Sequence, residues 1–234
     1  PLQRGSLQEA VAPAAPDRTR QWPAAMRALP ELEERELRAG VSERFGTALT
    51  EALFMASRDG VTFKRWDEAF IRPGIERPGT WTSGQNYVSW PLVETASPLP
   101  GAPNELSLYG SESYWTGTSS VARRHTLRLD GFVSAWAPMR GGELVTKPVR
   151  FQGRRLTLNF ATSAAGGVRV EIQDADGRVL PGFSREDCPP LFGDTVDRVV
   201  EGTGGASVAS VAGQPVRLRF KVRDGDLYSY QFQE

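Results

Sequence analysis

The chain has 234 residues and a mass of 25.7 kDa, with 28 basic and 28 acidic side chains and so no formal net charge. This length supports one or two ordinary hydrophobic cores. The balanced charge disfavours nucleic acid as a partner, because a phosphate backbone attracts an excess of positive charge. No run of 18 apolar residues occurs, which predicts no membrane span and no membrane partner. The first residues are neither basic nor strongly apolar, so we expect any targeting signal to be absent or already removed.

One cysteine and one histidine exclude several classes of site. Cys188 alone cannot form an internal disulfide or a multi-cysteine metal cluster, and it has no plausible histidine partner for thiol chemistry. With His125 as the single histidine, sites that need several histidine ligands are excluded. No motif requires a metal or another cofactor. Any acid–base chemistry is therefore expected to use carboxylates.

Residues 1–42 differ in composition from the rest of the chain. They are rich in Pro and Ala, and repeated prolines interrupt regular structure. Only Glu31 to Ala39 reads as a short helix, with acidic residues early and arginine late. We interpret this segment either as an arm lying on a body formed elsewhere or as a disordered tail.

Residues 43–140 have the pattern of short antiparallel strands separated by Gly, Pro and Asn turns. Strands are predicted over residues 48–57, 61–66, 86–95, 105–115, 121–129 and 131–136. No helical segment lies between them, which indicates a meander such as a propeller blade or a barrel. Asp59-Gly60 marks the first hairpin turn, where we expect the Asp59 carboxylate to accept backbone N–H groups.

Residues 141–234 alternate more regularly, which favours a β-sandwich of about 95 residues. Apolar residues at 216, 218, 220 and 222 alternate with basic ones, and this pattern is typical of a strand with one buried face. We interpret the basic face as a solvated edge strand. Arg223 to Asp226 is predicted to turn the chain back into a final strand. Asp174 to Gly177 resembles a calcium loop but lacks its later ligands, so a hairpin turn is expected.

The stretch between residues 81 and 115 combines aromatic rings with acidic groups, as sugar-binding sites do. The candidate catalytic carboxylates are Glu94, with Glu112 or Glu105 as its partner. The candidate substrate-binding residues are Trp81, Tyr87, Trp90, Tyr114, Arg123 and His125. The alternative is that many of the aromatic residues form a core. On strand alternation, Arg123 and His125 share one face and could bind a carboxylate or sugar hydroxyls, whereas Arg124 points the other way.

Many separate phrases of the chain resemble, in order, a group of bacterial proteins related to the five-bladed-propeller glycoside hydrolases of the family 32 and 43 type. The phrases begin with Leu53 to Gly60 (LFMASRDG), Glu68 to Gly74 (EAFIRPG) and Glu105 to Tyr109 (ELSLY). They continue with Leu127 to Ser134 (LRLDGFVS), Gly142 to Pro148 (GELVTKP), Val168 to Gly182 (VRVEIQDADGRVLPG) and Val216 to Phe220 (VRLRF).

The resemblance covers roughly residues 43–234 and implies the last propeller blades followed by a C-terminal β-sandwich. It also implies a carbohydrate-active protein, more often secreted or periplasmic than cytoplasmic. The Asn-Asp-Pro-like and Arg-Asp-Pro phrases that carry two of the family's carboxylates do not occur here. Because a partial propeller leaves strand edges uncovered, we expect self-association or a partner chain that covers the open edges.

Two functions from different classes follow. The first is hydrolysis of glycosidic bonds by paired carboxylates, with a glycan as substrate. The alternative is a non-catalytic module, derived from a hydrolase, that binds a carbohydrate or a protein. A structural fragment whose activity depends on residues outside this chain is a third hypothesis.

Overall fold

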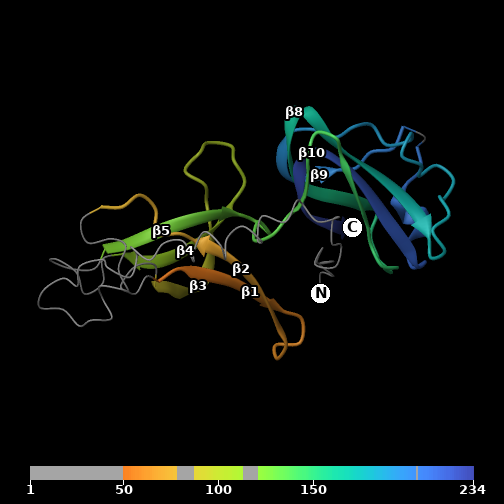
Figure 1. The fold of residues 1–234 in the computed structure, drawn as a ribbon. Helices are drawn as coiled ribbons and strands as arrows, with labels where there is room; N and C mark the ends of the chain where they lie inside the picture. The colour runs from red at the N-terminus through yellow and green to blue at the C-terminus, as the bar shows by residue number, and fades with distance from the viewer. Residues whose placement is uncertain (1–49, 78–86, 113–120, 204) are drawn as a thin grey trace, which may run out of the picture. The chain divides into compact units, whose positions relative to one another are not determined.

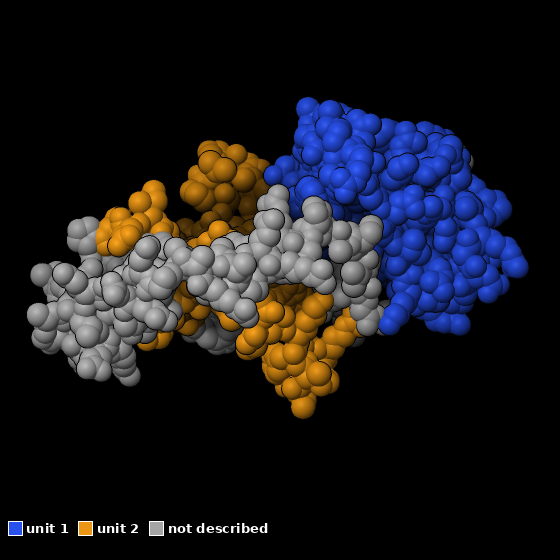
Figure 2. Space-filling model, in the orientation of Figure 1, with its two compact units in different colours: residues 1–16, 129–234 blue, residues 17–128 orange. Residues whose placement is uncertain are grey.

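The computed structural model describes residues 50–77, 87–112, 121–203 and 205–234, and its regular elements there are strands and one short 3-10 helix (Figure 1). The predicted all-β class is confirmed. These residues belong to two compact units, which are named here by their order in the chain (Figure 2). The first unit ends at Arg128 and is drawn in orange as unit 2 of the figure, and the second unit spans Leu129–Glu234 and is drawn in blue as unit 1. The division falls before the predicted boundary at 140/141. The predicted arm over 1–42 and its helix lie outside the described residues.

The first unit opens with a two-stranded hairpin. Strands β1 (Ala52–Ser57) and β2 (Phe63–Ile71) are antiparallel. The Asp59 carboxylate accepts hydrogen bonds from the backbone N–H groups of Val61 and Thr62 at 2.9 and 2.7 Å, and Gly60 has a φ of 75°. The turn at Asp59-Gly60 therefore forms as the sequence predicts. These hydrogen bonds hold the pKa of Asp59 far below its usual range.

The same unit contains a three-stranded antiparallel sheet. Its strands are β3 (Tyr87–Thr95), β4 (Glu105–Glu112) and β5 (Val121–Arg128), in the order β3-β4-β5. The register of β3 shifts between Ser89 and Val93, a segment that contains Pro91. Proline has no N–H to give to a ladder, so it is tolerated here at a bulge in an edge strand. The two sheets described in this unit have two and three strands, fewer than the four of a propeller blade.

The second unit is built on two long paired strands, β8 (Arg155–Asp174) and β10 (Val216–Gln233). The short strands β6 (Ala135–Ala137) and β7 (Gly142–Val145) pair with β10, and β9 (Asp194–Val199) pairs with β8. The resulting five-stranded sheet curls into a half-barrel (Figure 1). The 3-10 helix η3 (Val208–Val211) turns two buried valines towards the core.

The core of this unit follows the predicted alternation. The largest fully buried side chains belong to β8 and β10, and those on β10 alternate with polar neighbours. Phe220 pairs with Val170 across the ladder, and Leu218 pairs with Ile172. Near the end of β10, Phe232 stacks on Phe151 with ring centroids 3.6 Å apart. Burial of these side chains from both halves of the bent strands stabilises the unit.

Two predictions for β10 are wrong. Arg223 to Asp226 does not reverse the chain, because β10 continues through a shift in register between Arg223 and Gly225. Asp224 has a φ of 44°. A positive φ occurs in β-bulges as well as in hairpin turns, so the sequence pattern does not distinguish the two. The basic face also does not mark an edge, since β10 has strands on both sides. Arg219 pairs there with Glu143 at 2.6 Å and with Glu171 at 3.4 Å.

The Asp174 loop is a turn, as expected. The Asp174 carboxylate accepts hydrogen bonds from the backbone N–H groups of Asp176 and Arg178, both at 2.9 Å. Gly177 has a φ of 90°, and Gln173 bridges to Val179 across the turn. Within the described ranges no group of three His, Cys, Asp or Glu side chains could hold a metal ion.

We predict that Gly225→Ala destabilises the second unit by about 2 kcal/mol or more. A Cβ at this position would stand 2.6 Å from the backbone oxygen of Ala161, which cannot move without breaking the β8–β10 ladder. Gly167→Ala is the matched control, because its nearest neighbour would be 3.5 Å away. Urea denaturation, with hydrogen exchange of β8 and β10 amides as the local readout, measures both. Equal stability of the two variants would contradict the prediction.

Candidate ligand-binding site

Most predicted site residues that the structure describes lie on the sheet β3-β4-β5, whose two faces differ in chemistry. Residues that pair across antiparallel strands point to the same face. The face that carries His125 is called the histidine face and comprises Val88, Glu94, Leu106, Leu108, Gly110, Glu112, Val121, Arg123, His125 and Leu127. The opposite face is called the tyrosine face and comprises Tyr87, Ser89, Val93, Thr95, Glu105, Ser107, Tyr109, Ser111, Ala122, Arg124, Thr126 and Arg128.

A buried carboxylate organises the histidine face. One oxygen of Glu112, Oε2, accepts hydrogen bonds from Nη2 of Arg123 at 2.7 Å and from Nη2 of Arg77 at 3.2 Å. The Glu112 side chain is only 8% exposed, whereas those of Arg77 and Arg123 are 51% and 43% exposed. The structure therefore brings together three groups: two half-exposed cations and one buried anion.

These contacts fix the charge states of the histidine face. The hydrogen bond from Arg123 holds the pKa of Glu112 below its usual range, although burial opposes this effect. Burial, and then the positive charge of Arg123, lowers the pKa of His125. At neutral pH Glu112 is therefore ionised and His125 is neutral. An ionised Glu112 cannot donate a proton, so it lacks the property that a general acid needs.

A polar network crosses all three strands on the tyrosine face. Arg124 donates hydrogen bonds to Glu105 Oε1 at 2.7 Å, Ser107 Oγ at 2.8 Å and Thr95 Oγ1 at 3.0 Å. The hydroxyl oxygens of Thr95 and Ser107 are 2.8 Å apart and share a hydrogen bond. The guanidinium of Arg124 is thus held in one orientation, with partners on β3 and β4.

Two tyrosines stand beside this network on the same face. Tyr87 on β3 pairs with Ser111, two residues along β4 from Tyr109, so the two tyrosines are diagonal neighbours about 7 Å apart. Tyr87 is 47% exposed and Tyr109 is 41% exposed. Tyr109 pairs directly with Arg124 on β5. The face therefore offers two aromatic rings and an oriented cation to solvent.

The three candidate catalytic carboxylates do not come together. Glu94 and Glu112 share the histidine face, but Glu94 pairs with Leu106, six residues along β4 from Glu112, a separation of about 20 Å. Glu105 points to the tyrosine face, where its carboxylate forms an ion pair with Arg124 at 2.7 Å. Glu94 is exposed and accepts a hydrogen bond from Asn104 at 2.9 Å. No two of these residues form a facing pair on one face of the sheet.

The remaining candidate residues divide between described and undescribed parts of the chain. Arg123 and His125 share one face and Arg124 takes the other, as predicted. Trp81 and Tyr114 lie outside the described residues. Trp90 belongs to β3, but the description does not extend to its side chain.

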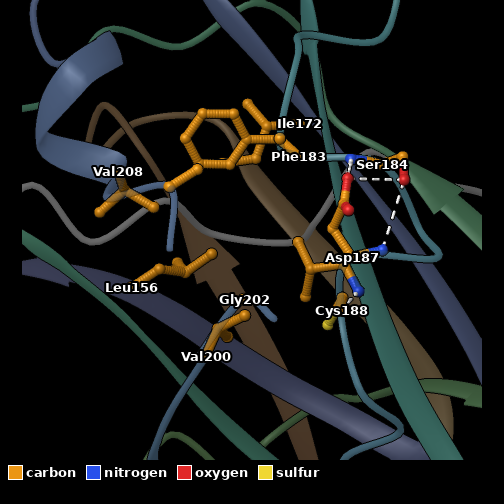
Figure 3. A pocket seen from close by; sticks show the side chains of 12 residues that line it. Leu156, Ile172, Phe183, Ser184, Asp187, Cys188, Val200, Gly202 and Val208 are labelled. Atoms are coloured by element: carbon orange, nitrogen blue, oxygen red, sulfur yellow. Dashed lines mark hydrogen bonds between the residues drawn. The ribbon is translucent and has the colours of Figure 1, made fainter. Parts of the chain in front are cut away.

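A separate cavity lies in the second unit, with a volume of about 30 Å³ (Figure 3). It is lined mainly by apolar side chains such as Leu156 and Phe183, and by buried Cys188. Burial raises the pKa of the Cys188 thiol, which accepts a hydrogen bond from the Val170 N–H at 3.3 Å. This volume holds a few water-sized molecules and no sugar ring.

Among the residues that the structure describes, none forms a helix with the length and hydrophobicity that a membrane span requires.

Three important residues, Arg77, Arg124 and Tyr109, are absent from the candidates predicted from the sequence. Arg77 follows β2 and reaches Glu112 from 35 residues away, which no local pattern indicates. For Arg124, strand alternation predicts only that its side chain points away from Arg123 and His125. Its hydrogen-bond network could not be predicted, because it depends on the register of three strands. Tyr109 belongs to the aromatic stretch, and its pairing with Arg124 is what distinguishes it from the other rings.

Comparisons with protein-family models, with curated proteins and with solved structures found no match to this chain.

We predict that Glu112→Gln lowers the free energy of unfolding of the first unit by about 1–2 kcal/mol at pH 7. Because the pKa of Glu112 is lowered on folding, its ionised form contributes stability above pH 4.5, and this contribution is lost as the pH falls through the folded-state value. The loss caused by the substitution should therefore shrink at pH 3.5. Urea denaturation followed by tryptophan fluorescence measures it, since five of the six tryptophans precede residue 129.

Glu68→Gln is the control for this prediction, because Glu68 is an exposed glutamate on β2 of the same unit. It should change the free energy of unfolding by less than about 0.5 kcal/mol at either pH. A loss for Glu112→Gln that is the same at pH 7 and pH 3.5 would show that the ionised pair does not stabilise the unit.

Proposed function

We propose that this chain is a non-catalytic carbohydrate-binding protein that holds a glycan on the tyrosine face. The observation that carries the proposal is the pair of half-exposed tyrosines, Tyr87 and Tyr109, beside the oriented guanidinium of Arg124. Sugar rings have apolar C–H faces and polar hydroxyl edges. A surface that joins flat aromatic rings to fixed hydrogen-bonding groups matches both parts of such a ligand.

The network around Arg124 supports binding in a second way. Holding a long side chain in one orientation normally costs conformational entropy when a ligand binds. Here three hydrogen bonds to Glu105, Ser107 and Thr95 already orient the guanidinium in the protein. Ligand hydroxyls can therefore bind to its edge and to the Glu105 carboxylate with less loss of freedom.

Binding is favoured over hydrolysis by the positions of the acidic groups. Glycosidases act with two carboxyl groups about 5–10 Å apart, on either side of the bond that breaks. Glu94 and Glu112 are about 20 Å apart along the sheet, and Glu105 is on its opposite face. Hydrolysis with Glu94 as the acid remains the alternative derived from the sequence.

We also infer that the first unit derives from the last blades of a propeller and that the second unit derives from a β-sandwich. The all-β class, the antiparallel meander and the curled C-terminal sheet are compatible with this origin. Self-association, or binding of a partner chain to the open strand edges, belongs to the same proposal. In the described part of the first unit, β3 and β5 are the edges of a three-stranded sheet, and such edges can pair with another strand.

We predict that Tyr109→Ala and Tyr87→Ala each weaken glycan binding about tenfold, because each removes a stacking surface. Affinity electrophoresis in gels that contain xylan, arabinan, starch or yeast mannan measures the retardation of the chain. Phe192→Ala is the matched control, since Phe192 is an exposed aromatic residue of the other unit. It should bind as the unaltered chain does.

No retardation by any of these polysaccharides, or equal loss for Phe192→Ala and Tyr109→Ala, would refute the proposed binding face. Circular dichroism of each variant separates loss of binding from loss of fold.

We predict further that the chain releases no sugar from the polysaccharides that it binds. Chromatography of the products after prolonged incubation measures this. Released sugar that disappears in Glu94→Gln would instead support the hydrolase hypothesis and would identify Glu94 as its acid.

A further inference from the structure

We propose that the basic face of β10 in the second unit binds a polysaccharide with repeated carboxylate groups, a polyuronate. This face comprises Arg217, Arg219, Lys221 and Arg223. The proposal concerns a different unit from the tyrosine face and a charged ligand, so it goes beyond the proposed function and does not depend on it.

The positive charges of the basic face form a regular row. Alternate residues of a strand point to one face about 7 Å apart, so the four cations extend over about 20 Å. Lys221 and Arg223 are exposed, and the Arg219 side chain is 35% exposed. Arg169 on β8 adds a further cation, because it pairs with Lys221 across the ladder. An extended chain with regularly repeated negative charges matches such a row.

Carboxylates of the protein neutralise little of this charge. Among the residues that the structure describes, Glu143 and Glu171 are the carboxylates that pair with the row, and both bind Arg219. No described carboxylate forms an ion pair with the other three cations of the row. The basic face therefore keeps an excess of positive charge, although the chain as a whole has none.

Two of the arginines are nevertheless held in fixed orientations. Arg217 donates hydrogen bonds to the backbone oxygens of Ala175 at 3.0 Å and Thr146 at 3.4 Å. Nε of Arg223 donates to the backbone oxygen of Ala165 at 3.1 Å. A carbonyl oxygen orients a guanidinium without cancelling its charge, and other N–H donors of the group stay available to a ligand. Cations oriented before binding lose less conformational freedom when a ligand arrives.

Glu143 on β7 shows how a carboxylate binds among these cations. Its Oε2 accepts hydrogen bonds from Nε and Nη2 of Arg219 at 3.2 and 2.6 Å, and Nη1 of Arg185 lies 3.9 Å from Oε1. The hydrogen bond from Arg219, and then the charges of Arg219, Lys221 and Arg185, hold the pKa of this carboxylate below its usual range against the effect of burial. A ligand carboxylate beside Lys221 meets the same positive charges and stays ionised there.

The position of the row in the sheet favours a polysaccharide over other polyanions. A peptide strand binds a sheet through the backbone groups of an open edge, whereas β10 has strands on both sides. Single-stranded nucleic acid requires aromatic rings on which its bases stack. The row and its ladder partners on β7 and β8 contain no aromatic residue; these partners are Glu143, Val145, Gly167, Arg169, Glu171 and Gln173. A polyuronate needs only cations at intervals, and the guanidinium fork matches its carboxylates.

Isothermal titration calorimetry of the full chain with polygalacturonate at low ionic strength tests the proposal. Fully methyl-esterified polygalacturonate is the matched ligand, because it has the same sugar backbone without the charges. We expect saturable binding of the acidic polymer that weakens as salt is added, and much weaker binding of the ester. No binding of the acidic polymer, or equal affinity for both polymers, would overturn the proposal.

Two further titrations distinguish the other classes of polyanion. Poly-L-glutamate offers carboxylates on a peptide, and single-stranded DNA offers phosphates and bases. Binding of either polymer as tightly as polygalacturonate would overturn the assignment to a polyuronate. Tyr109→Ala should leave polygalacturonate binding unchanged, so a failure of the basic face and a failure of the tyrosine face are distinguishable.

Substitutions locate the site on β10. Lys221→Gln and Arg223→Gln should each weaken polygalacturonate binding at least about threefold and make it less dependent on salt. Arg155→Gln is the matched control, because Arg155 is also exposed and also donates to a backbone oxygen, but it lies opposite Gln233 at the other end of β10. Circular dichroism confirms the fold of each variant. Unchanged affinity in a folded Lys221→Gln, Arg223→Gln double variant, or an equal loss in Arg155→Gln, would refute the site.

Discussion

The pairing of β8 with β10 is the constraint on which the C-terminal unit depends. The two strands run antiparallel along almost their whole lengths, and the other strands of the sheet attach to one or the other of them. A sheet made of two such long strands can enclose a core only if both bend. The bend occurs where Arg223 pairs with Gly167 and Gly225 pairs with Thr162. Between these two pairs, residues 163–166 of β8 lie opposite a single residue of β10, Asp224. Gly166 and Gly225 permit the backbones to approach there at distances that a Cβ would prevent.

The first unit is organised by polar contacts to a greater degree. Its described strands bury few large apolar side chains, of which Leu108 and Ile71 are the clearest. Glu112 joins β4 to β5 and to the segment after β2, and Arg124 joins β5 to β4 and β3. Interactions of this kind contribute less per contact than a packed core and are sensitive to protonation. The same contacts hold charged side chains in fixed orientations at the surface, which is the condition for a preorganised binding face.

The sequence predicts the elements of this protein better than their connections. Alternation at Val216, Leu218 and Phe220 identifies a strand with one buried face, and the Asp59-Gly60 turn follows from local hydrogen bonding alone. The same reasoning fails at Asp224-Gly225, because a residue with positive φ is compatible with either a hairpin turn or a bulge. Only the pairing partner distinguishes the two, and that partner is some 60 residues away. Contacts between distant segments, such as Arg77 with Glu112, are hidden from sequence patterns for the same reason.

The candidate site shows how strand register decides function. Alternation alone puts Arg123 and His125 on one face and Arg124 on the other, and this is what the structure shows. Whether three glutamates cooperate depends instead on how far the strands slide past one another. The bulge around Pro91 inserts two extra residues into β3, an even number, so Glu94 keeps its face while its partner on β4 becomes Leu106. That register leaves Glu94 and Glu112 at opposite ends of one face. A carboxylate at each end of a strand cannot act on one bond, and this separation is the reason that binding rather than hydrolysis is proposed for these faces.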